Sequence, residues 1–379
     1  MSAFVNRLCI HSTVPRLLAT LAVGLCTLPA LAQQDFEVEV VATDLEHPWS
    51  LAFLPDGGYL VTERPGRLRL LDEDGTLDPE PVTGLPEDLH AEAQAGLKDV
   101  VLAPDFTESG RLFLSYACGT ASANTTCLAA AQLKGGHLEN LEVVFRADPL
   151  REGSVHYGGR ILLLPDDTLL LTLGDGFSYR AQAQNPDNHI GKVVRLNFDG
   201  SVPTDNPFIG DPDTRDEIFT LGHRNPQGIV YDADNDRIIA HEHGARGGDE
   251  LNILRAGRNY GWPLTTTGID YTGARITPFT ELPGLVSPIL TWTPALAPSG
   301  LSRYDGFLFP HWQGDLFIGG LAGQSVRRVR LDGDEVIEQE TLLADRGERY
   351  RDVRTGPDGA LYLLVDQQDG RLLRLVPAR

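Results

Sequence analysis

Short apolar runs separated by polar turns recur along the whole chain and predict many short β-strands. In the unit that begins at Leu51, the run Leu51-Ala-Phe-Leu54 leads into the turn Pro55-Asp-Gly-Gly58. A second apolar run, Tyr59-Leu-Val-Thr62, follows that turn. Apolar runs joined by Pro-Asp or Asp-Gly turns are typical of β-hairpins. No long stretch repeats apolar residues at the spacing of an α-helix, so the pattern predicts an all-β protein.

The same strand–turn–strand unit occurs six times, at spacings of about 50 to 75 residues. The six units begin near Leu51, Val100, Leu162, Ile229, Leu301 and Val353. Several units add a third run, at Leu68–Asp72, Val193–Asn197, Val326–Asp332 and Arg371–Leu375. A large β-sandwich would not repeat one unit in this way, so we expect a six-bladed β-propeller. The alternating segment Phe36–Ala42 is expected to supply the outer strand of the last blade and to close the ring.

The N-terminus has the pattern of a secretory signal peptide. Arg7 and Arg16 precede the apolar run Leu17–Leu28, and Ala30-Leu-Ala32 offers a site for cleavage. We expect residues 1–32 to be removed and residues 33–379 to form one catalytic domain that is periplasmic or secreted. A retained anchor helix is the alternative, although no later segment is long enough to span a membrane.

Charge and cysteine content narrow the class of protein further. The 379-residue chain has a net charge of -21, which argues against a nucleic-acid partner. Removal of the leader leaves Cys118 and Cys127, close in sequence and in an oxidising compartment. We expect a disulfide between them that stabilises the fold by roughly 2–3 kcal/mol.

A histidine and an aspartate flank the third hairpin. His156 precedes the first of its two apolar runs, and Asp175 follows the second, with Pro165-Asp-Asp167 as the turn. The outer ends of two hairpin strands lie side by side, so we expect His156 and Asp175 to be neighbours. A carboxylate beside an imidazole orients it and raises its basicity, as a general base requires. The alternative is a loop histidine and a turn-forming aspartate without a joint role.

Other polar residues occupy the same position in their units as His156 does in its own. They stand at the entries to the first strands, where the loops of a propeller converge on one face. These residues are Gln94, Arg224, Asn225, Arg349 and Arg351. Three guanidinium groups in a chain of this charge favour a small polyanionic ligand. Strand alternation places the side chains of Arg349 and Arg351 on one side of their strand.

The segment His241–Asn252 is rich in glycine and carboxylates. Backbone carbonyls and carboxylates suit a hard cation such as calcium. His241 and His243 are also compatible with zinc, but no third ligand is evident, and calcium is favoured. An ordinary glycine-rich turn is the remaining alternative.

The motifs together resemble the soluble pyrroloquinoline quinone (PQQ)-dependent aldose sugar dehydrogenases and glucose dehydrogenases. The resemblance extends from about Leu45 to Leu375, and its most specific part is Leu221-Gly-His-Arg-Asn-Pro-Gln-Gly228. The other motifs are Gln94-x-Gly-Leu97, His156-x-Gly-Gly-Arg160, Leu173-Gly-Asp175, Gly191–Gly200, Asp249-Glu-Leu-Asn252, Gly257-x-Asn-Tyr-Gly-Trp-Pro263 and Arg349-Tyr-Arg-Asp352.

This resemblance implies a role for each candidate residue. His156 takes the proton from the anomeric hydroxyl of an aldose while hydride passes to PQQ, and Asp175 orients His156. The residues implied to contact PQQ are Gln94, Arg224, Asn225, Arg349 and Arg351. Ca²⁺ polarises the reactive quinone carbonyl. Its implied carbonyl ligands are Gly244 and Ala245, and Glu250 and Tyr260 are implied to hold a second calcium.

The chain departs from the glucose-oxidising branch at two positions of the fifth blade. Ala322 and Ala295 stand where that branch has a lysine and a threonine, which predicts weaker PQQ binding. Its dimerisation insertions are absent, so we expect a monomer that passes electrons to a soluble acceptor. The alternatives to a dehydrogenase are a calcium-dependent lactonase, which needs carboxylates around the axis, and a non-catalytic propeller that binds a ligand or a protein.

Overall fold

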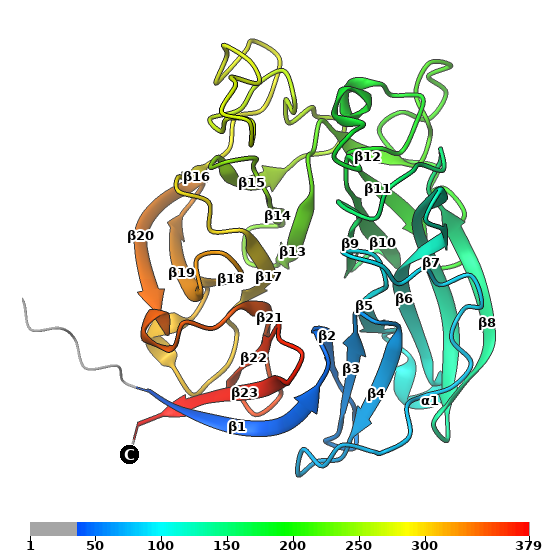
Figure 1. Cartoon of the computed structure of the whole chain (residues 1–379), viewed down its shortest axis with the longest axis vertical. Helices are drawn as coiled ribbons and strands as arrows, with labels where there is room; N and C mark the ends of the chain where they lie inside the picture. The colour runs from blue at the N-terminus through cyan, green and yellow to red at the C-terminus, as the bar shows by residue number, and fades with distance from the viewer. Residues whose placement is uncertain (1–35, 379) are drawn as a thin grey trace, which may run out of the picture. The chain divides into compact units, whose positions relative to one another are not determined.

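Six antiparallel sheets surround a common axis in the computed structural model, which describes residues 36–378 (Figure 1). The first strand of each sheet lies nearest the axis. These inner strands contact one another in a closed cycle, in the order β2, β5, β9, β13, β17, β21 and back to β2. The described chain is therefore a six-bladed β-propeller, as the repeats predict.

Each blade is formed by consecutive strands that follow one another from the axis outward. Blade one contains β2 (Pro48–Phe53), β3 (Tyr59–Glu63) and β4 (Arg67–Leu71). Blade two contains β5 (Leu97–Leu102), β6 (Arg111–Thr120), β7 (Ala123–Lys134) and β8 (His137–Arg146). Blade three contains β9 (Gly158–Leu163), β10 (Thr168–Leu173), β11 (Lys192–Asn197) and β12 (Ile218–Leu221). Blade four contains β13 (Pro226–Asp232), β14 (Arg237–Glu242), β15 (Asp249–Leu254) and β16 (Leu290–Trp292). Blade five contains β17 (Pro298–Arg303), β18 (Leu316–Gly320), β19 (Ser325–Asp332) and β20 (Glu335–Leu342).

The sixth blade joins the two ends of the described chain. Its strands are β21 (Tyr350–Thr355), β22 (Leu361–Val365), β23 (Gly370–Pro377) and β1 (Phe36–Leu45). The N-terminal strand pairs antiparallel with β23, with Val38 opposite Leu375, so it is the outer strand of the last blade as predicted. This pairing covers the outer edge of β23 and closes the ring.

Apolar residues on both faces of the strands hold neighbouring blades together. β10 illustrates this, since all six of its residues are buried. Leu169 and Leu171 pack with Phe113 of blade two, whereas Leu170 packs with Ile229 of blade four. Each such leucine contributes about 1.5–3 kcal/mol through burial. A strand between two blades is thus apolar throughout, which explains its uninterrupted leucines.

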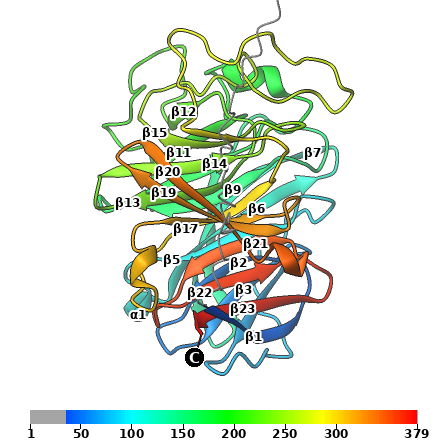
Figure 2. The same cartoon turned by 90° about the vertical axis from the view of Figure 1, so that its left-hand side faces the viewer.

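The segments outside the sheets are mostly loops. The short helices are α1 (Phe106–Ser109), η1 (Arg180–Gln184), η2 (Pro310–Trp312) and η3 (Ala344–Arg346). The longest excursion runs from β15 to β16 and projects from the rim, coloured yellow-green in Figure 1 and Figure 2. None of the helices within residues 36–378 is long and apolar enough to cross a membrane. The expected signal peptide, residues 1–32, lies outside the described residues.

The predicted disulfide is present and joins two adjacent strands of blade two. Cys118 of β6 and Cys127 of β7 are both fully buried, with their Cα atoms 5.9 Å apart. Cys118 pairs directly with Thr125, so the bridge runs diagonally across the ladder. It fastens a hairpin that is already hydrogen-bonded, which makes its role structural.

Candidate active site

The hairpin of β9 and β10 brings His156 and Asp175 together, as the sequence predicts. Nδ1 of His156 lies 2.7 Å from Oδ1 of Asp175, and both side chains are buried. The backbone of Gly174 passes so close to His156 that a Cβ there would lie 2.1 Å from the His156 carbonyl oxygen. A glycine before Asp175 is therefore needed for the two chain segments to approach.

Burial leaves the imidazole of His156 neutral, and its bond to Asp175 sets the tautomer. Desolvation lowers the pKa of His156 from its ordinary value of 6.5, and the hydrogen bond to Asp175 only partly offsets this. Burial by itself raises the pKa of Asp175. The hydrogen bond from His156 and the charge of the nearby Arg224 more than compensate, so this pKa is lowered. With Asp175 ionised, Nδ1–H of His156 donates to it. Nε2 is left unprotonated and has no hydrogen-bond partner among the described residues.

Trp262 is a third member of this arrangement that the sequence did not reveal. Its indole Nε1–H donates to Oδ2 of Asp175 over 2.8 Å, and the backbone N–H of Phe177 donates to Oδ1 over 2.7 Å. Asp175 thus accepts three hydrogen bonds, from His156, Trp262 and Phe177. Three donors fix the orientation of the carboxylate and stabilise its ionised form. Trp262 belongs to the motif that begins at Gly257, which indicated a family likeness but no contact.

Gln94 reaches His156 from the entry to blade two. Its side-chain Oε1 accepts the backbone N–H of His156 over 3.0 Å, so it contacts the main chain of the histidine. The ammonium of Lys98 in turn donates to the Gln94 carbonyl. Burial, and then the charges of Arg351 and Arg64, lower the pKa of Lys98 well below its ordinary value. Gln94 therefore lies just before β5, at the entry to blade two, and its side chain holds the backbone of His156 in place.

Arg224 and Asn225 lie at the entry to blade four, beside the histidine–aspartate pair. The carbonyl of Arg224 accepts the backbone N–H of Asp175 over 2.8 Å. Asn225 accepts the N–H of Gly158 over 3.0 Å through Oδ1. The Arg224 guanidinium lies 5.4 Å from the Trp262 ring, a favourable cation–π distance. Blades three and four therefore share these residues at their common boundary.

Arg349, just before β21, and Arg351, within it, reach the same carboxylate, although the ladder is irregular between Tyr350 and Asp352 and regular alternation does not apply there. Both approach Oδ2 of Asp366, at 3.8 Å and 2.6 Å respectively. Nε of Arg351 is buried and has no hydrogen-bond partner among the described residues. Burial lowers the pKa of Arg64, after β3; Asp366 opposes this change, and the charges of Arg351 and Arg349 add to it. Asp366 thus faces two guanidinium groups directly, which leaves excess positive charge and an unused donor.

His243 lies between the two groups of residues. Burial lowers its pKa well below the ordinary value, and Arg224, His156 and Arg351 lower it further. The His243 carbonyl accepts an N–H of Arg224 over 3.2 Å, and the His243 ring donates to the Pro298 carbonyl over 2.9 Å. The next residue, Ser299, accepts an N–H of Arg351 over 3.3 Å. These contacts connect the entries to blades four and six, whose equivalent positions predict that they converge.

The loop that carries Gly244 and Ala245 is held by Asp249. The Asp249 carboxylate accepts the N–H of Gly244 over 2.7 Å and the N–H of Ala297 over 2.7 Å. The loop histidines bond to backbone instead: Nε2–H of His241 donates to Gly300, and the corresponding atom of His243 donates to Pro298. No group of three or more His, Cys, Asp or Glu side chains within residues 36–378 is arranged to hold a metal ion.

Glu250 and Tyr260 are both connected to a second carboxylate, that of Glu242. Glu250 lies opposite Glu242 in the ladder of β14 and β15, and Tyr260 stacks on His223, the partner of Glu242, with ring centroids 4.9 Å apart. Burial and the neighbouring charge of Glu242 raise the pKa of Glu250 well above its ordinary value. The hydroxyl of Tyr260 donates to the Ile253 carbonyl over 2.7 Å.

Two cavities adjoin these residues and share Ala245 and Tyr271. One, of about 330 Å³, is lined by Asp175, Phe177, Ser178, Arg180, Arg224, Ala245, Trp262, Asp270, Tyr271 and Ile276. The other, of about 540 Å³, is lined by residues that include His243, Gly244, Ala245 and Asp249. Ala295 and Ala322, the two positions that depart from the glucose-oxidising branch, both line the larger of the two. The methyl groups there offer no hydrogen bond to a ligand.

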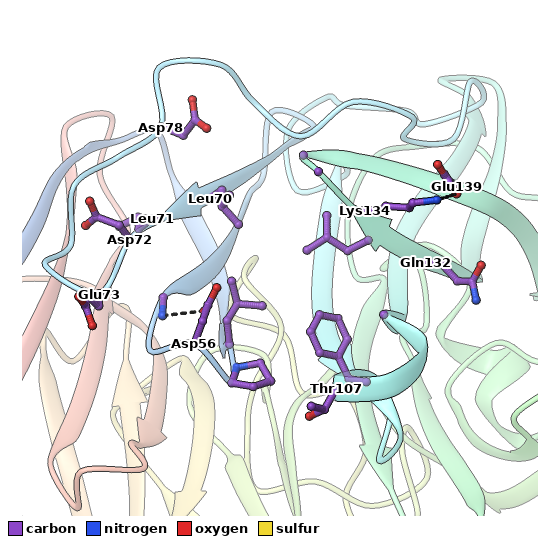
Figure 3. A pocket seen from close by; sticks show the side chains of 18 of the residues that line it. Asp56, Leu70, Leu71, Asp72, Glu73, Asp78, Thr107, Gln132, Lys134 and Glu139 are labelled. Carbon is purple, nitrogen blue, oxygen red and sulfur yellow. Dashed lines mark hydrogen bonds and ion pairs between the residues drawn. The ribbon is translucent and has the colours of Figure 1, made fainter.

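A separate cavity of about 1180 Å³ lies between blades one and two (Figure 3). Its walls come from the ends of β4 and β7 and from α1, and none of the candidate residues lines it. Its rim is acidic, and its one cation, Lys134, is paired with Glu139 at 3.6 Å. This cavity contains none of the predicted chemistry.

The inner strands also carry carboxylates, which the sequence interpretation did not place there. Asp99 of β5 and Asp352 of β21 are both almost completely buried. Arg160 lies 2.9 Å from Asp352, and Arg354 lies 3.0 Å from Asp99. Arg160 also stacks over the ring of Trp49 at 4.0 Å. These carboxylates are neutralised within the fold, and neither lines the two cavities beside Ala245.

Comparison with known proteins identifies the family of the chain. The sequence model of the Glucose / Sorbosone dehydrogenase family matches residues 45–374. Aldose sugar dehydrogenase YliI of Escherichia coli strain K12 is 42% identical over 361 residues, which cover 93% of this chain and 96% of that protein. A crystal structure of a glucose dehydrogenase is 46% identical with a TM-score of 0.87, covering 90% of this chain and 100% of the other. The PQQ-bound aldose sugar dehydrogenase of Streptomyces coelicolor is 27% identical with a TM-score of 0.73, covering 90% and 98% of the two chains. The chain therefore belongs to the glucose/sorbosone dehydrogenase family.

Proposed function

We propose that the protein is a quinoprotein sugar dehydrogenase that oxidises the anomeric carbon of aldoses to lactones with PQQ and Ca²⁺. The observation that carries the proposal is the buried His156–Asp175 pair at 2.7 Å, beside a cavity that Arg224 lines. The family membership supports the reaction class. The PQQ-bound relative supports the cofactor.

His156 is the general base. Its Nε2 is unprotonated at neutral pH because burial lowers the pKa of the imidazole and because Nδ1–H is bonded to Asp175. Nε2 takes the proton of the anomeric hydroxyl, while the hydrogen on the anomeric carbon leaves with its electron pair and a C=O bond forms. Asp175 stabilises the imidazolium that results. Trp262 and Phe177 keep the carboxylate in the orientation that this requires.

The positive residues would bind the quinone. When bound, PQQ supplies the acceptor for the hydride and its two electrons. Its carboxylates suit Arg349 and Arg351, since among residues 36–378 their ion pairs are with Asp366 alone and Nε of Arg351 has no hydrogen-bond partner. Arg224 and Asn225 suit the quinone oxygens of PQQ. Gln94, whose side chain accepts the backbone N–H of His156, would lie near the sugar and the cofactor. Ala322 and Ala295 supply no polar contact, so we expect weaker binding than with the glucose-oxidising pattern.

Two calcium ions complete the proposal. Gly244 and Ala245 line the cavity of about 540 Å³, so their carbonyls suit a hard cation that would polarise the quinone. A second calcium would be held by Glu250 and the Tyr260 carbonyl. The neighbouring carboxylates of Glu250 and Glu242 fit a cation, because a positive ion between these two side chains would relieve their repulsion. We further propose a monomeric, exported protein, periplasmic or secreted, that passes electrons to a soluble acceptor.

Reconstitution tests this function. Purified protein is incubated with PQQ and CaCl₂, and reduction of an artificial dye is followed with several aldoses; protein without PQQ is the control. Turnover that needs both PQQ and an aldose is the expected result. Bound PQQ with no dye reduction by any aldose would overturn the proposal. Hydrolysis of an added lactone by the PQQ-free protein would point instead to the calcium-dependent lactonase.

A further inference from the structure

Two aromatic side chains stand beside His156 and are largely exposed. The ring of Phe177 meets the imidazole edge-to-face, with centroids 5.4 Å apart and an interplanar angle of 79°. The ring of Tyr271 stacks on the outer side of Phe177, with centroids 6.1 Å apart and an angle of 28°. Phe177 is 48% exposed and Tyr271 is 58% exposed. Neither ring serves the core, so their position needs another explanation.

Local structure directs Phe177 toward this place. The residue has a φ of 64°, in the left-handed region that bulky residues rarely adopt. Its backbone N–H is bonded to Asp175 Oδ1, the same oxygen that accepts the imidazole N–H. One carboxylate thus positions both the base and the aromatic ring. Backbone strain at such a position is characteristic of functional sites.

The two rings line the 330 Å³ cavity together with Trp262, Ala245 and Ile276. The polar residues of the lining are Asp175, Ser178, Arg180, Arg224 and Asp270. The volume is at the lower end of the range of about 300–1,000 Å³ for small-molecule sites. An apolar face beside several hydroxyl-binding groups matches a pyranose, which has an apolar C–H face and a polar edge.

The two rings come from different loops, and an ion pair connects these loops close to the rings. Phe177 follows blade three's β10, whereas Tyr271 lies on the excursion between β15 and β16. Arg180 and Asp270, close to the two rings in sequence, are 3.1 Å apart. Both are partly exposed, so the pair adds little stability, and its atoms remain accessible to hydroxyl groups.

We propose that Phe177 and Tyr271 form the aromatic wall of a pyranose subsite, on which the C–H face of the sugar stacks while its anomeric hydroxyl faces His156. Arg180 and Asp270 bind hydroxyls of the same ring. The inference rests on the proposed function and names the residues through which the site holds its substrate. It predicts that the wall determines sugar affinity, and that replacement of Phe177, which lines the 330 Å³ cavity and not the 540 Å³ one, leaves quinone affinity unchanged.

The test compares Phe177→Ala and Tyr271→Ala with Phe279→Ala, a control on the same excursion whose ring is 50% exposed. The two wall variants should raise KM for glucose on the order of tenfold each, with little change in kcat, because ring stacking is lost. The control should match the wild type. Phe177→Trp, which keeps an aromatic ring at this position, should have a low KM like that of the wild type. The affinity for PQQ, measured by titration, should be the same in the Phe177 variants, the control and the wild type, because Phe177 does not line the 540 Å³ cavity.

A second measurement separates this inference from the proposed function. Binding of 1,5-anhydroglucitol, which lacks the anomeric hydroxyl, is measured by calorimetry on PQQ-loaded protein. Weaker binding in the wall variants supports the subsite even if no sugar is oxidised, in which case only the proposed function fails. Unchanged KM and unchanged binding in both variants would overturn the subsite. A fall in kcat alone would also overturn it, since Phe177 would then only hold His156.

Discussion

The indole N–H of Trp262 donates a hydrogen bond to Oδ2 of Asp175 across 87 residues of sequence, at 2.8 Å. The other oxygen of the same carboxylate accepts the imidazole N–H of His156. Trp262 therefore acts on His156 through Asp175, which makes it a positioning residue, and it also lines the 330 Å³ cavity. Its ring also lies beneath the guanidinium of Arg224.

Replacement of Trp262 tests this role. Trp262→Phe keeps a ring but removes a hydrogen bond to a charged group, worth about 1.5–3 kcal/mol, so kcat should fall roughly 10- to 100-fold. The carboxylate becomes more basic without this donor, so the pKa of His156 rises and the acid limb of the pH profile moves to higher pH. Steady-state kinetics across pH measure both effects.

A matched control is available in the same blade. Trp292 is also buried, and its Nε1–H donates to Gln339 over 3.2 Å, away from the site. Trp292→Phe should leave the pH profile unchanged. Equal profiles for both variants would show that Trp262 has only a packing role.

The pH dependence of turnover follows from the buried imidazole. Proton abstraction needs neutral His156, and desolvation lowers the pKa of this group below 6.5 despite the bond to Asp175. Activity is therefore lost as pH falls through this lowered pKa and is fully present at neutral pH. The acid limb of kcat/KM for an aldose should have its midpoint below pH 6.5. A midpoint above pH 7 would contradict the assignment of His156 as the base.

Calcium should stabilise the fold through Glu250. A cation held by Glu250 and the Tyr260 carbonyl would offset the repulsion between the facing carboxylates of Glu250 and Glu242. The Tm of the wild type should therefore rise when CaCl₂ replaces EGTA. In Glu250→Gln most of this rise should disappear, whereas Glu335→Gln, at the start of β20 in blade five, should keep it. An equal rise in all three proteins would place the stabilising ion elsewhere.

The disulfide should contribute to stability and not to catalysis. The double variant Cys118→Ala, Cys127→Ala loses a cross-link that closes a separation of nine residues. Its free energy of unfolding in denaturant should be lower by roughly 2–3 kcal/mol, with kcat and KM for the aldose unchanged. Lost turnover in the folded variant would show that blade two's bridge also supports the site.

The fold was predictable because its signals are local and repeated. A turn such as Pro55–Gly58 between two apolar runs specifies a hairpin, and six such units leave few alternatives to a propeller. The closing strand β1 followed from the alternation of Phe36–Ala42, since an unpaired edge on the last blade would be unfavourable.

The parts of the site that depend on strand geometry were equally accessible. Hairpin pairing places His156 beside Asp175, and Arg349 and Arg351, two residues apart, reach the same carboxylate as expected, although the strand is irregular there. The equivalent positions of the strand entries then predict that these residues converge.

The remaining contacts depend on loop conformations that no periodic pattern encodes. Trp262 and Tyr271 reach the site from the irregular excursion between β15 and β16, and nothing in their sequence spacing from Asp175 indicates proximity. The buried pairs that Arg160 and Arg354 make with Asp99 and Asp352 were missed for a related reason. They join inner strands of three blades, and only the closed ring brings these strands together.

The most direct test of the whole account is a single variant, His156→Asn, measured for two properties. The variant and the wild type are loaded with PQQ and CaCl₂, PQQ affinity is determined by titration, and glucose-dependent dye reduction is then followed. Because His156 supplies the base and the other residues supply the binding, PQQ affinity should be nearly unchanged and kcat should fall about 10²- to 10⁴-fold. Wild-type rates of dye reduction in His156→Asn, with PQQ bound, would contradict the assignment of the base.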